Sequence, residues 1–227
     1  MITIVIPAQN EEKRLPTTVL AFSHYFPSAD ILIVTNNCTD NTEDVARELS
    51  RKLKNVQHLS TPGTGKGRAI YAGMLAAHHK YVGFVDADLA TAPEEFAKLI
   101  LHLNNYECVI GSRWLAGAKV TNKEPLKVLF ASRALNIIVR FIFNIPVKDS
   151  QCGAKVFKTA FVKKIIPLCI VKDITFDVEL LWRIRKEGGT IKEVPITWHH
   201  NEEGSKTKVI KNSILMIKNM IRMVNSL

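Results

Sequence analysis

Short apolar runs recur through the first half of the chain, and stretches with helical periodicity separate them. The runs are residues 2–6, 31–34, 56–59, 81–85 and 108–110, and the helical stretches include 42–53 and 93–103. Most runs are continuously apolar rather than alternating, which is typical of strands buried on both faces of a sheet. The pattern therefore predicts βαβ units and an α/β fold with a mostly parallel sheet flanked by helices. In such sheets ligands bind where the carboxyl ends of the strands gather.

The pattern changes after Gly117. Residues 125–143 form a long apolar stretch with a few basic and polar interruptions, and a second αβ block follows at 160–197. In the final segment, 206–227, five basic residues and no acidic one accompany Ile210, Ile214, Ile217, Ile221 and Val224, which repeat at spacings of four and three. Two amphipathic helices are therefore predicted, and each either packs on the core or lies in a membrane interface. For the C-terminal helix, contact with a second copy of the chain in a homo-oligomer is a further alternative.

Length and composition narrow the class of protein. The chain has 227 residues, of which 47% are hydrophobic and 23% charged, which favours one domain over 1–227 and excludes global disorder. The pattern divides this domain into residues 1–117, 118–205 and 206–227. A net charge of +10 predicts an anionic partner, either a nucleic acid, an anionic lipid or a phosphorylated substrate. Three Trp and four Tyr, without interleaved basic residues, argue against nucleic acid.

The spacing of the cysteines and the lack of long apolar runs help to predict where in the cell the protein is located. The four cysteines lie far apart with no CxxC pair, which excludes a structural zinc ribbon and argues against a disulfide framework. The first residues lack the basic region and cleavage site of a signal peptide, and no apolar run approaches the roughly 20 residues that span a bilayer. We therefore expect a cytoplasmic protein that is soluble or peripheral to a membrane.

Two carboxylates separated by one residue, Asp86 and Asp88, directly follow the run 81–85. Carboxylates placed side by side repel each other unless a cation or hydrogen-bond donors offset the charge. A hard divalent ion such as Mg²⁺ or Mn²⁺, shared with ligand phosphates, offsets it naturally. The alternative is that Asp86 faces solvent while Asp88 caps a helix that has Pro93 in its first turn.

The glycine-rich segment 61–68 resembles a phosphate-binding P-loop but fails the spacing test. Position 60 is Ser60 where a P-loop requires its first glycine, and Gly67 replaces the residue that holds Mg²⁺. What remains is a pair of glycines beside Lys66 and Arg68 at a predicted helix start, where backbone amides favour anions. A simple turn explains the segment equally well.

Three further groups of reactive side chains carry weaker signals. Cys152, in the polar loop 149–155, has no neighbouring histidine and no sign of a lowered pKa, which argues against a nucleophile. Asp177 and Glu179 are predicted on different sides of a helix, where Asp177 serves either chemistry or the helix N-terminus. His199 and its neighbour at position 200 point to opposite sides of a strand, so they are not expected to share a metal ion.

Taken in order, these motifs resemble the family 2 glycosyltransferases of GT-A fold, and in particular the branch that makes polyprenyl-phosphate or dolichyl-phosphate sugars. The resemblance runs over nearly the whole chain, from Ile4 to Lys206, and each motif is weak when taken singly. The matching segments are residues 6–11, 37–42, 65–67, 86–88, 111–113, 149–155 and 204–206. Seven motifs in the family's order make coincidence a poor explanation.

The resemblance implies a role for each matching residue. Nucleotide contacts fall to Pro7, Ala8, Asn10, Glu11, Asn36, Asn37, Asp40, Gly65, Lys66, Asp86 and Ala87. Asp88, with Asp86, is expected to bind the metal, Mg²⁺ or Mn²⁺. Arg113 is expected to be a catalytic residue together with these two aspartates. Contacts with the donor or acceptor phosphate fall to Ser132, Arg133, Gln151, Gly153, Lys155, Ser205 and Lys206. Asp177 and Glu179 receive no assigned role.

Two departures from the family pattern bear on the donor. The second loop reads Thr35-Asn36-Asn37 where an acidic pair is usual, so the resemblance does not fix the nucleobase, although Asn36 offers both an acceptor and a donor. Ala90 stands where the mannosyl branch usually has glutamine. This substitution, together with Gln151-Cys152-Gly153, favours UDP-glucose over GDP-mannose.

The resulting hypothesis is transfer of a hexose from a nucleoside-diphosphate sugar to a polyprenyl phosphate, with inversion of the anomeric carbon. The acceptor monoester has a second pKa of about 6 and is largely ionised at neutral pH, so it needs little help from a general base. The protein is expected on the cytoplasmic face of a membrane, in contact with anionic headgroups through its amphipathic helices. The alternatives are a sugar-nucleotide nucleotidyltransferase, a non-catalytic basic module that binds phosphates or membranes, and a transferase-like protein that has lost activity.

Overall fold

The computed structural model of the chain describes residues 1–121, 126–199 and 209–224. The strands are β1 (Ile2–Ala8), β2 (Asp30–Asn36), β3 (Val56–Thr61), β4 (Tyr81–Val85), β5 (Cys108–Ser112), β6 (Lys119–Thr121), β7 (Ala154–Lys158), β8 (Ile191–Pro195) and β9 (Thr197–His199). The α-helices are α1 (Leu15–Tyr25), α2 (Thr42–Lys52), α3 (Lys66–Ala76), α4 (Pro93–Ile100), α5 (Leu126–Phe143), α6 (Thr159–Ile165), α7 (Phe176–Lys186) and α8 (Val209–Val224), and η1 (Ile166–Leu168) is a 3₁₀ turn. All five apolar runs of the first half form strands, as predicted.

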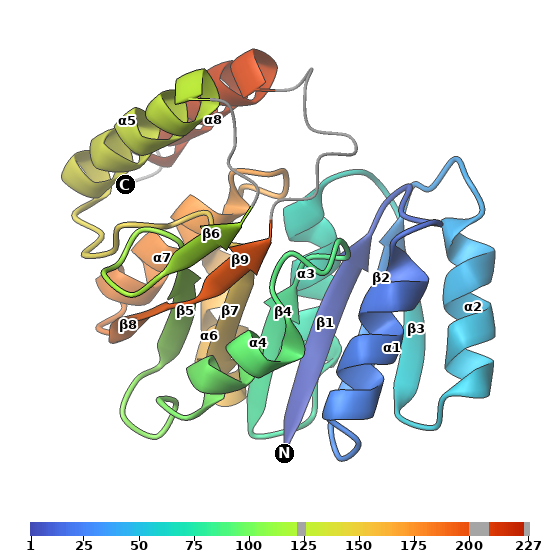
Figure 1. Cartoon of the computed structure of the whole chain (residues 1–227). Helices are drawn as coiled ribbons and strands as arrows, with labels where there is room; N and C mark the ends of the chain where they lie inside the picture. Colours follow the sequence, from blue (N-terminus) through green and yellow to red (C-terminus); the bar gives the residue numbers. More distant parts are fainter. Residues whose placement is uncertain (122–125, 200–208, 225–227) are drawn as a thin grey trace.

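Within the described residues, seven strands form one sheet in the order β3-β2-β1-β4-β7-β5-β8 (Figure 1). The first four strands are parallel to one another, and β5 is parallel to β8. Strand β7 runs antiparallel to both of its neighbours, β4 and β5. The expected α/β fold with a mostly parallel sheet is confirmed. The antiparallel strand was not predicted: residues 149–155 were assigned to a polar loop, and no element was assigned to the residues that directly follow.

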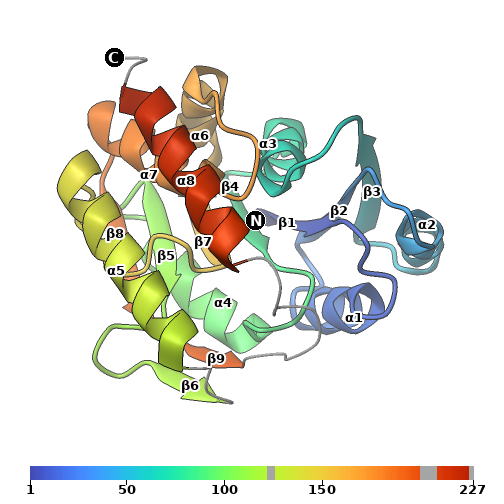
Figure 2. The same ribbon diagram turned by 90° about the horizontal axis from the view of Figure 1, so that it is seen from above.

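Helices cover both faces of this sheet, which explains why its strands are apolar throughout. Val5 and Val34 pack in one hydrophobic cluster with residues of α3, α6 and α7. Ile4 and Ile33, one position away on the same strands, pack in a second cluster with residues of α1, α2 and α4. The view from above shows these two helical layers on opposite sides of the sheet (Figure 2). Because alternate side chains meet different layers, each strand needs apolar residues at successive positions.

The two predicted amphipathic helices, α5 and α8, lie side by side in both views, above the edge of the sheet at which β1 ends (Figures 1 and 2). Beside the main sheet, β6 and β9 form a short parallel pair. Phe143 near the end of α5 packs on Trp182 of α7, with ring centroids 5.7 Å apart. No helix in the described part of the chain is long and apolar enough to cross a membrane.

Helix α8 turns its methionines inward, and the isoleucine repeat marks a different face of the helix. Met216, Met220 and Met223 are buried, whereas Ile221 is 57% exposed and Ile217 is 48% exposed. The flexible methionine side chains pack in one hydrophobic cluster with Phe176 and Leu180 of α7, while Ile217 and Ile221 face outward. The periodicity identified a helical face correctly, but that face is not the one that packs on the core.

Candidate active site

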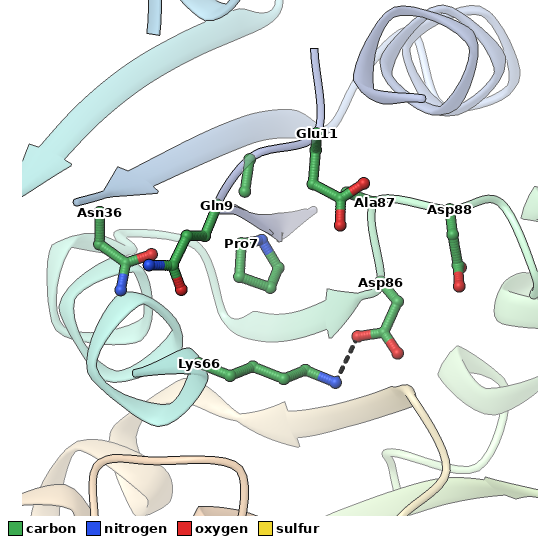
Figure 3. A pocket seen from close by; sticks show the side chains of 9 residues that line it. Pro7, Gln9, Glu11, Asn36, Lys66, Asp86, Ala87 and Asp88 are labelled. Carbon is green, nitrogen blue, oxygen red and sulfur yellow. Dashed lines mark ion pairs between the residues drawn. The ribbon is translucent and has the colours of Figure 1, made fainter. Parts of the chain in front are cut away.

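Strand ends and loops from four parts of the chain surround one pocket at the carboxyl edge of the sheet (Figure 3). Its lining comprises Pro7, Ala8, Gln9 and Glu11 after β1, Asn36 at the end of β2, Lys66 at the start of α3, and Asp86, Ala87 and Asp88 after β4. All of these except Gln9 were predicted as nucleotide or metal contacts. The structure therefore brings together side chains that lie up to 81 residues apart in the sequence, as the strand-end rule predicts.

The backbone around Asp86 fixes its carboxylate against the 149–155 loop. The Asp86 N–H donates to the carbonyl oxygen of Gly153 at 3.2 Å. A Cβ atom at position 153 would lie 2.1 Å from Asp86 Oδ2, so only glycine leaves room for this carboxylate. Gly153 therefore contributes to the site by leaving room for Asp86. From the sequence, Gly153 was predicted as a phosphate contact, and this role was not predicted.

Asp88 is held by a local turn rather than by a helix cap. Its Oδ1 accepts a hydrogen bond from the backbone N–H of Ala90 at 3.0 Å, and α4 begins only at Pro93. Figure 3 shows Asp86, Asp88 and Glu11 on the same side of the pocket. The alternative of a helix-capping Asp88 is therefore wrong.

Lys66 supplies a positive charge to these carboxylates. Its Nζ lies 2.5 Å from Asp86 Oδ1, an ion pair visible in Figure 3. Burial by itself would lower the pKa of Lys66, but Asp86, Asp177 and Asp88 together raise this pKa above its ordinary value. Lys66 consequently remains a cation throughout the neutral range.

The carboxylates themselves carry unfavourable charge. Burial, followed by repulsion from Asp86, raises the pKa of Asp88, while the Ala90 N–H, Lys66 and Arg14 oppose the rise. Burial also raises the pKa of Glu11, although Arg14 pairs with it at 2.6 Å. A pocket that gathers more carboxylate charge than one lysine offsets favours the binding of a further cation.

The donor set fits a hard divalent ion that is shared with a ligand. Within the described residues, no group of three or more His, Cys, Asp or Glu side chains forms a complete metal cage. Asp86 Oδ1 is buried and, apart from its ion pair with Lys66, accepts no hydrogen bond there. Two carboxylates one residue apart suit Mg²⁺ or Mn²⁺, which are commonly bound by one or two carboxylates plus phosphates and water.

Gly65 and Gly67, at the start of α3, allow its close packing against residues 172–176. A Cβ atom at Gly65 would lie 2.2 Å from the carbonyl oxygen of Lys172, and one at Gly67 would lie 2.4 Å from Phe176 Cβ. The amides of Gly67 and Arg68 donate to the carbonyl oxygens of Asp173 and Lys172, at 3.3 and 3.0 Å. These two amides are therefore not available to an anion, and only the contact of the Lys66 side chain with a phosphate stays a prediction.

Asn36 belongs to the pocket lining, whereas the other predicted nucleotide residues, Asn10, Asn37, Asp40 and Gly65, do not. Asn36 Nδ2 donates to Gly65 O at 3.1 Å and so orients the turn before α3. Asn10 bonds to the side chain and amide of Thr39, and Asp40 accepts from the Glu12 amide, so both side chains tie the first two loops together. Asn37 is exposed, with φ of 47°.

Arg113 is held in place by an aspartate that the sequence reading did not single out. Its Nε and Nη2 donate to the two oxygens of Asp149 at 2.7 and 2.8 Å, and its backbone N–H donates to the same carboxylate at 3.0 Å. The guanidinium also lies 5.8 Å from the ring centre of Trp114 and 5.1 Å from that of Trp198. Such bidentate, stacked geometry fixes an arginine far more firmly than a surface position does.

Lys155 lies in the core and not at a phosphate site. Its side chain is fully buried in β7, and Nζ contacts Asp177 Oδ1 at 2.5 Å and Cys152 O at 2.6 Å. A buried ammonium must be paired, and Asp177 on α7 supplies the partner. The prediction that Lys155 contacts a phosphate is therefore wrong, and Asp177 has a structural partner.

Other predicted residues have structural partners or fall outside the described side chains. Glu179 accepts the backbone N–H groups of Ile170 and Val171, and burial raises the pKa of the Cys152 thiol to about 12, which argues further against a nucleophile. Gln151 Nε2 lies 3.5 Å from Met216 Sδ on α8. The side chain of Ser132 on α5 and the predicted contacts Ser205 and Lys206 lie outside the described residues.

Comparison with known proteins identifies a family and a fold. The model of the family described as "Glycosyl transferase family 2" matches residues 3–166. Dolichyl-phosphate beta-glucosyltransferases of Trichomonas vaginalis and Saccharomyces cerevisiae are 31% and 30% identical to this chain, each over 97% of it and over 72% and 73% of their own lengths. A polyprenol monophosphomannose synthase of Mycolicibacterium smegmatis is 30% identical over 88% of this chain and 78% of its own length.

A solved structure supports the fold assignment. The crystal structure of glucosyl-3-phosphoglycerate synthase from Mycobacterium tuberculosis, in complex with Mn²⁺, UDP-glucose and phosphoglyceric acid, has a TM-score of 0.75 against this chain. The match covers 98% of this chain and 79% of that one at 16% sequence identity. At this identity the likeness concerns the fold alone, and it confirms the GT-A architecture expected from the sequence.

Proposed function

The chain belongs to glycosyl transferase family 2, and on that premise we propose that it transfers a hexose from a nucleoside-diphosphate sugar to the phosphate of a polyprenyl or dolichyl phosphate. The observation that carries this proposal is the pocket in which Asp86, Asp88 and Lys66 meet at the carboxyl ends of β1, β2 and β4. The names of the relatives at about 30% identity support the acceptor class. Anomeric inversion follows if the acceptor oxygen attacks directly.

Asp88, assisted by Asp86, would hold the divalent ion, Mg²⁺ or Mn²⁺. When bound, the ion offsets the negative charge that develops on the departing nucleoside diphosphate. Lys66 would add a second positive charge. With the metal offsetting the charge of Asp86, the Lys66 ammonium would no longer be needed for that ion pair and could contact a phosphate. Gly153 would keep Asp86 in position, because its carbonyl oxygen accepts the Asp86 N–H.

The first two strand ends would receive the nucleoside. Pro7, Ala8 and Gln9 form one wall of the pocket and Asn36 forms another. Asn36 is 2% exposed and its amide N–H groups bond to the turn at Gly63 and Gly65, so it shapes the base site as well as bordering it. We favour UDP-glucose as the donor and place GDP-mannose next.

The acceptor would approach from the side of α5. A cavity between this helix and its flanking loops is lined by Trp114, Arg133, Asn136, Ile137, Arg140 and Lys148. Three cations beside apolar side chains suit a phosphate that carries a hydrocarbon chain. Because the acceptor monoester is already ionised at neutral pH, its oxygen is a nucleophile without proton removal.

The outward faces of α5 and α8 would rest on lipid. Phe141 is 84% exposed, and Ile137, Ile138, Ile142, Ile217 and Ile221 are each about half exposed. Arg133, Arg140, Lys218 and Arg222 are exposed on the same two helices. Apolar side chains flanked by basic ones are typical of helices at an anionic membrane surface. Placement on the cytoplasmic face stays a prediction.

The direct test is a transfer assay with a short polyprenyl phosphate, Mn²⁺ or Mg²⁺, and radiolabelled UDP-glucose or GDP-mannose. We expect a lipid-extractable sugar phosphodiester with one of the two donors, and no product when the metal is chelated. An Arg51→Gln variant, altered at an exposed position on α2, serves as the matched control and is expected to retain activity. Failure of both donors with every metal would contradict the proposed function.

A further inference from the structure

One amide side chain on α8 is buried among methionines. Asn219 is 2% exposed and lies on the same inward face as Met216, Met220 and Met223. Its Nδ2 donates to Asp173 Oδ2 at 2.7 Å and to Thr175 Oγ1 at 3.1 Å. A buried polar group with two partners of good geometry specifies the position of a helix more narrowly than apolar packing does.

The partners of Asn219 belong to segment 172–176, which also clamps the start of α3. Asp173 Oδ1 accepts the Thr175 N–H at 2.8 Å, so the segment is internally fixed. Its carbonyl oxygens at Asp173 and Lys172 accept the N–H groups of Gly67 and Arg68. Neither Gly65 nor Gly67 leaves room for a Cβ atom against the segment, which shows how closely the two backbones approach.

Lys66 lies between these two glycines, and its ammonium reaches into the pocket to Asp86 at 2.5 Å. The contacts therefore form an unbroken series from α8, through Asp173 and the first amides of α3, to the cation of the site. Every step of this series is a contact between described atoms.

We propose that Asn219 is a positioning residue for Lys66: it fixes segment 172–176, and this segment sets where α3 begins and where the Lys66 ammonium lies. The nucleotide readout of this inference rests on the proposed function, but the positional link does not. The same helix exposes Ile217, Lys218, Ile221 and Arg222 on its outward face. The helix proposed to meet lipid thus also sets the geometry of the donor site.

The link itself is tested without any ligand, by amide hydrogen exchange of the full chain. Asn219→Leu removes both hydrogen bonds and keeps a side chain of similar size, whereas Met220→Leu changes the adjacent buried position without touching a polar contact. We expect the Gly67 and Arg68 amides to exchange about 3- to 10-fold faster in Asn219→Leu and at the wild-type rate in Met220→Leu. Unchanged exchange in Asn219→Leu, or an equal rise in both variants, overturns the proposal.

A double-mutant cycle tests the effect on the site, with UDP or GDP plus Mn²⁺ as the probe, whichever the wild type binds. Asn219→Leu is expected to weaken diphosphate binding by about 3- to 10-fold, and by less than about twofold when Lys66 is already alanine. Equal weakening in both backgrounds would mean a general structural role and overturns the positioning of Lys66. A wild type that binds neither nucleotide contradicts the proposed function, and hydrogen exchange then decides the inference alone.

Discussion

The pocket at the carboxyl edge of the sheet and the helix pair α5 and α8 differ in which kinds of side chain they bury and which they expose. Around the pocket, strands β1, β2 and β4 bury most of their apolar side chains, and the charged groups gather where the strands end. On the helix pair, polar Asn136 and Asn219 are buried while Phe141 and Ile221 are exposed. Buried polar groups and exposed apolar surface are the informative departures from ordinary burial. The difference is the one expected if the pocket receives small ligands and the helix pair rests on a lipid surface, as proposed above.

The largest expected effect concerns the pocket. Asp88→Ala removes a carboxylate that would hold the divalent ion, and we expect the transfer rate to fall by about 10³-fold. The measurement is product formation at saturating donor and metal, with circular dichroism to establish that the variant is folded. A variant as active as the wild type would show that the two aspartates hold no catalytic metal.

The charge behind the pocket tests whether Lys155 is structural. Lys155→Met leaves Asp177 buried and unpaired, and we expect the free energy of unfolding to fall by about 3–5 kcal/mol, as measured in urea. The double variant Lys155→Met/Asp177→Leu removes both charges and should recover most of this loss. If Lys155→Met were as stable as the wild type, the ion pair would not explain why a lysine lies in the core.

The exposed face of the helix pair is expected to respond in binding and not in folding. Phe141→Ser combined with Ile221→Ser should weaken binding to anionic vesicles by at least about 100-fold, because each side chain contributes about 1.5–3 kcal/mol when it leaves water. The melting temperature should stay within about 2 °C of the wild type, since neither side chain is buried in the chain itself. Leu20→Ser, at an exposed apolar position on α1, is the matched control and should leave vesicle binding unchanged.

The smallest expected effect is a gain in stability from Asp88→Asn, a substitution that should lower activity because Asp88 is proposed to hold the metal ion. Without metal, Asp88→Asn should stabilise the fold by about 0.5–2 kcal/mol at pH 7.5, since it removes a carboxylate charge that burial and Asp86 disfavour. Because the pKa of Asp88 is raised in the folded state, its charge destabilises the protein above that pKa.

The stability gain should therefore shrink as the pH falls and vanish below the ordinary value of 3.8, where Asp88 is protonated in both states. Thermal melts of both proteins at several pH values in a chelator measure the difference. A gain that persists at low pH would exclude charge as its cause.

The sequence by itself determined strands β1 to β5, the strand-end position of Asp86 and Asp88, and the two amphipathic helices. These features depend on local periodicity and on the rule that parallel strands present their carboxyl ends at one edge, and both can be read from neighbouring residues. The family resemblance then brought most of the pocket lining into one hypothesis. Gln9 was not predicted as a site residue, although it lies within the first motif and lines the pocket.

Only the tertiary structure decided which charged residues face the pocket and which lie in the core. Lys155 pairs with Asp177, 22 residues away, and Arg113 pairs with Asp149, 36 residues away, so neither partner is visible in a local pattern. The tertiary structure also decided that methionines rather than isoleucines of α8 turn inward, and that Asn219 reaches Asp173. The physical reason is that hydrophobic periodicity specifies a face, while the shape and charge of the opposing surface determine which face is buried.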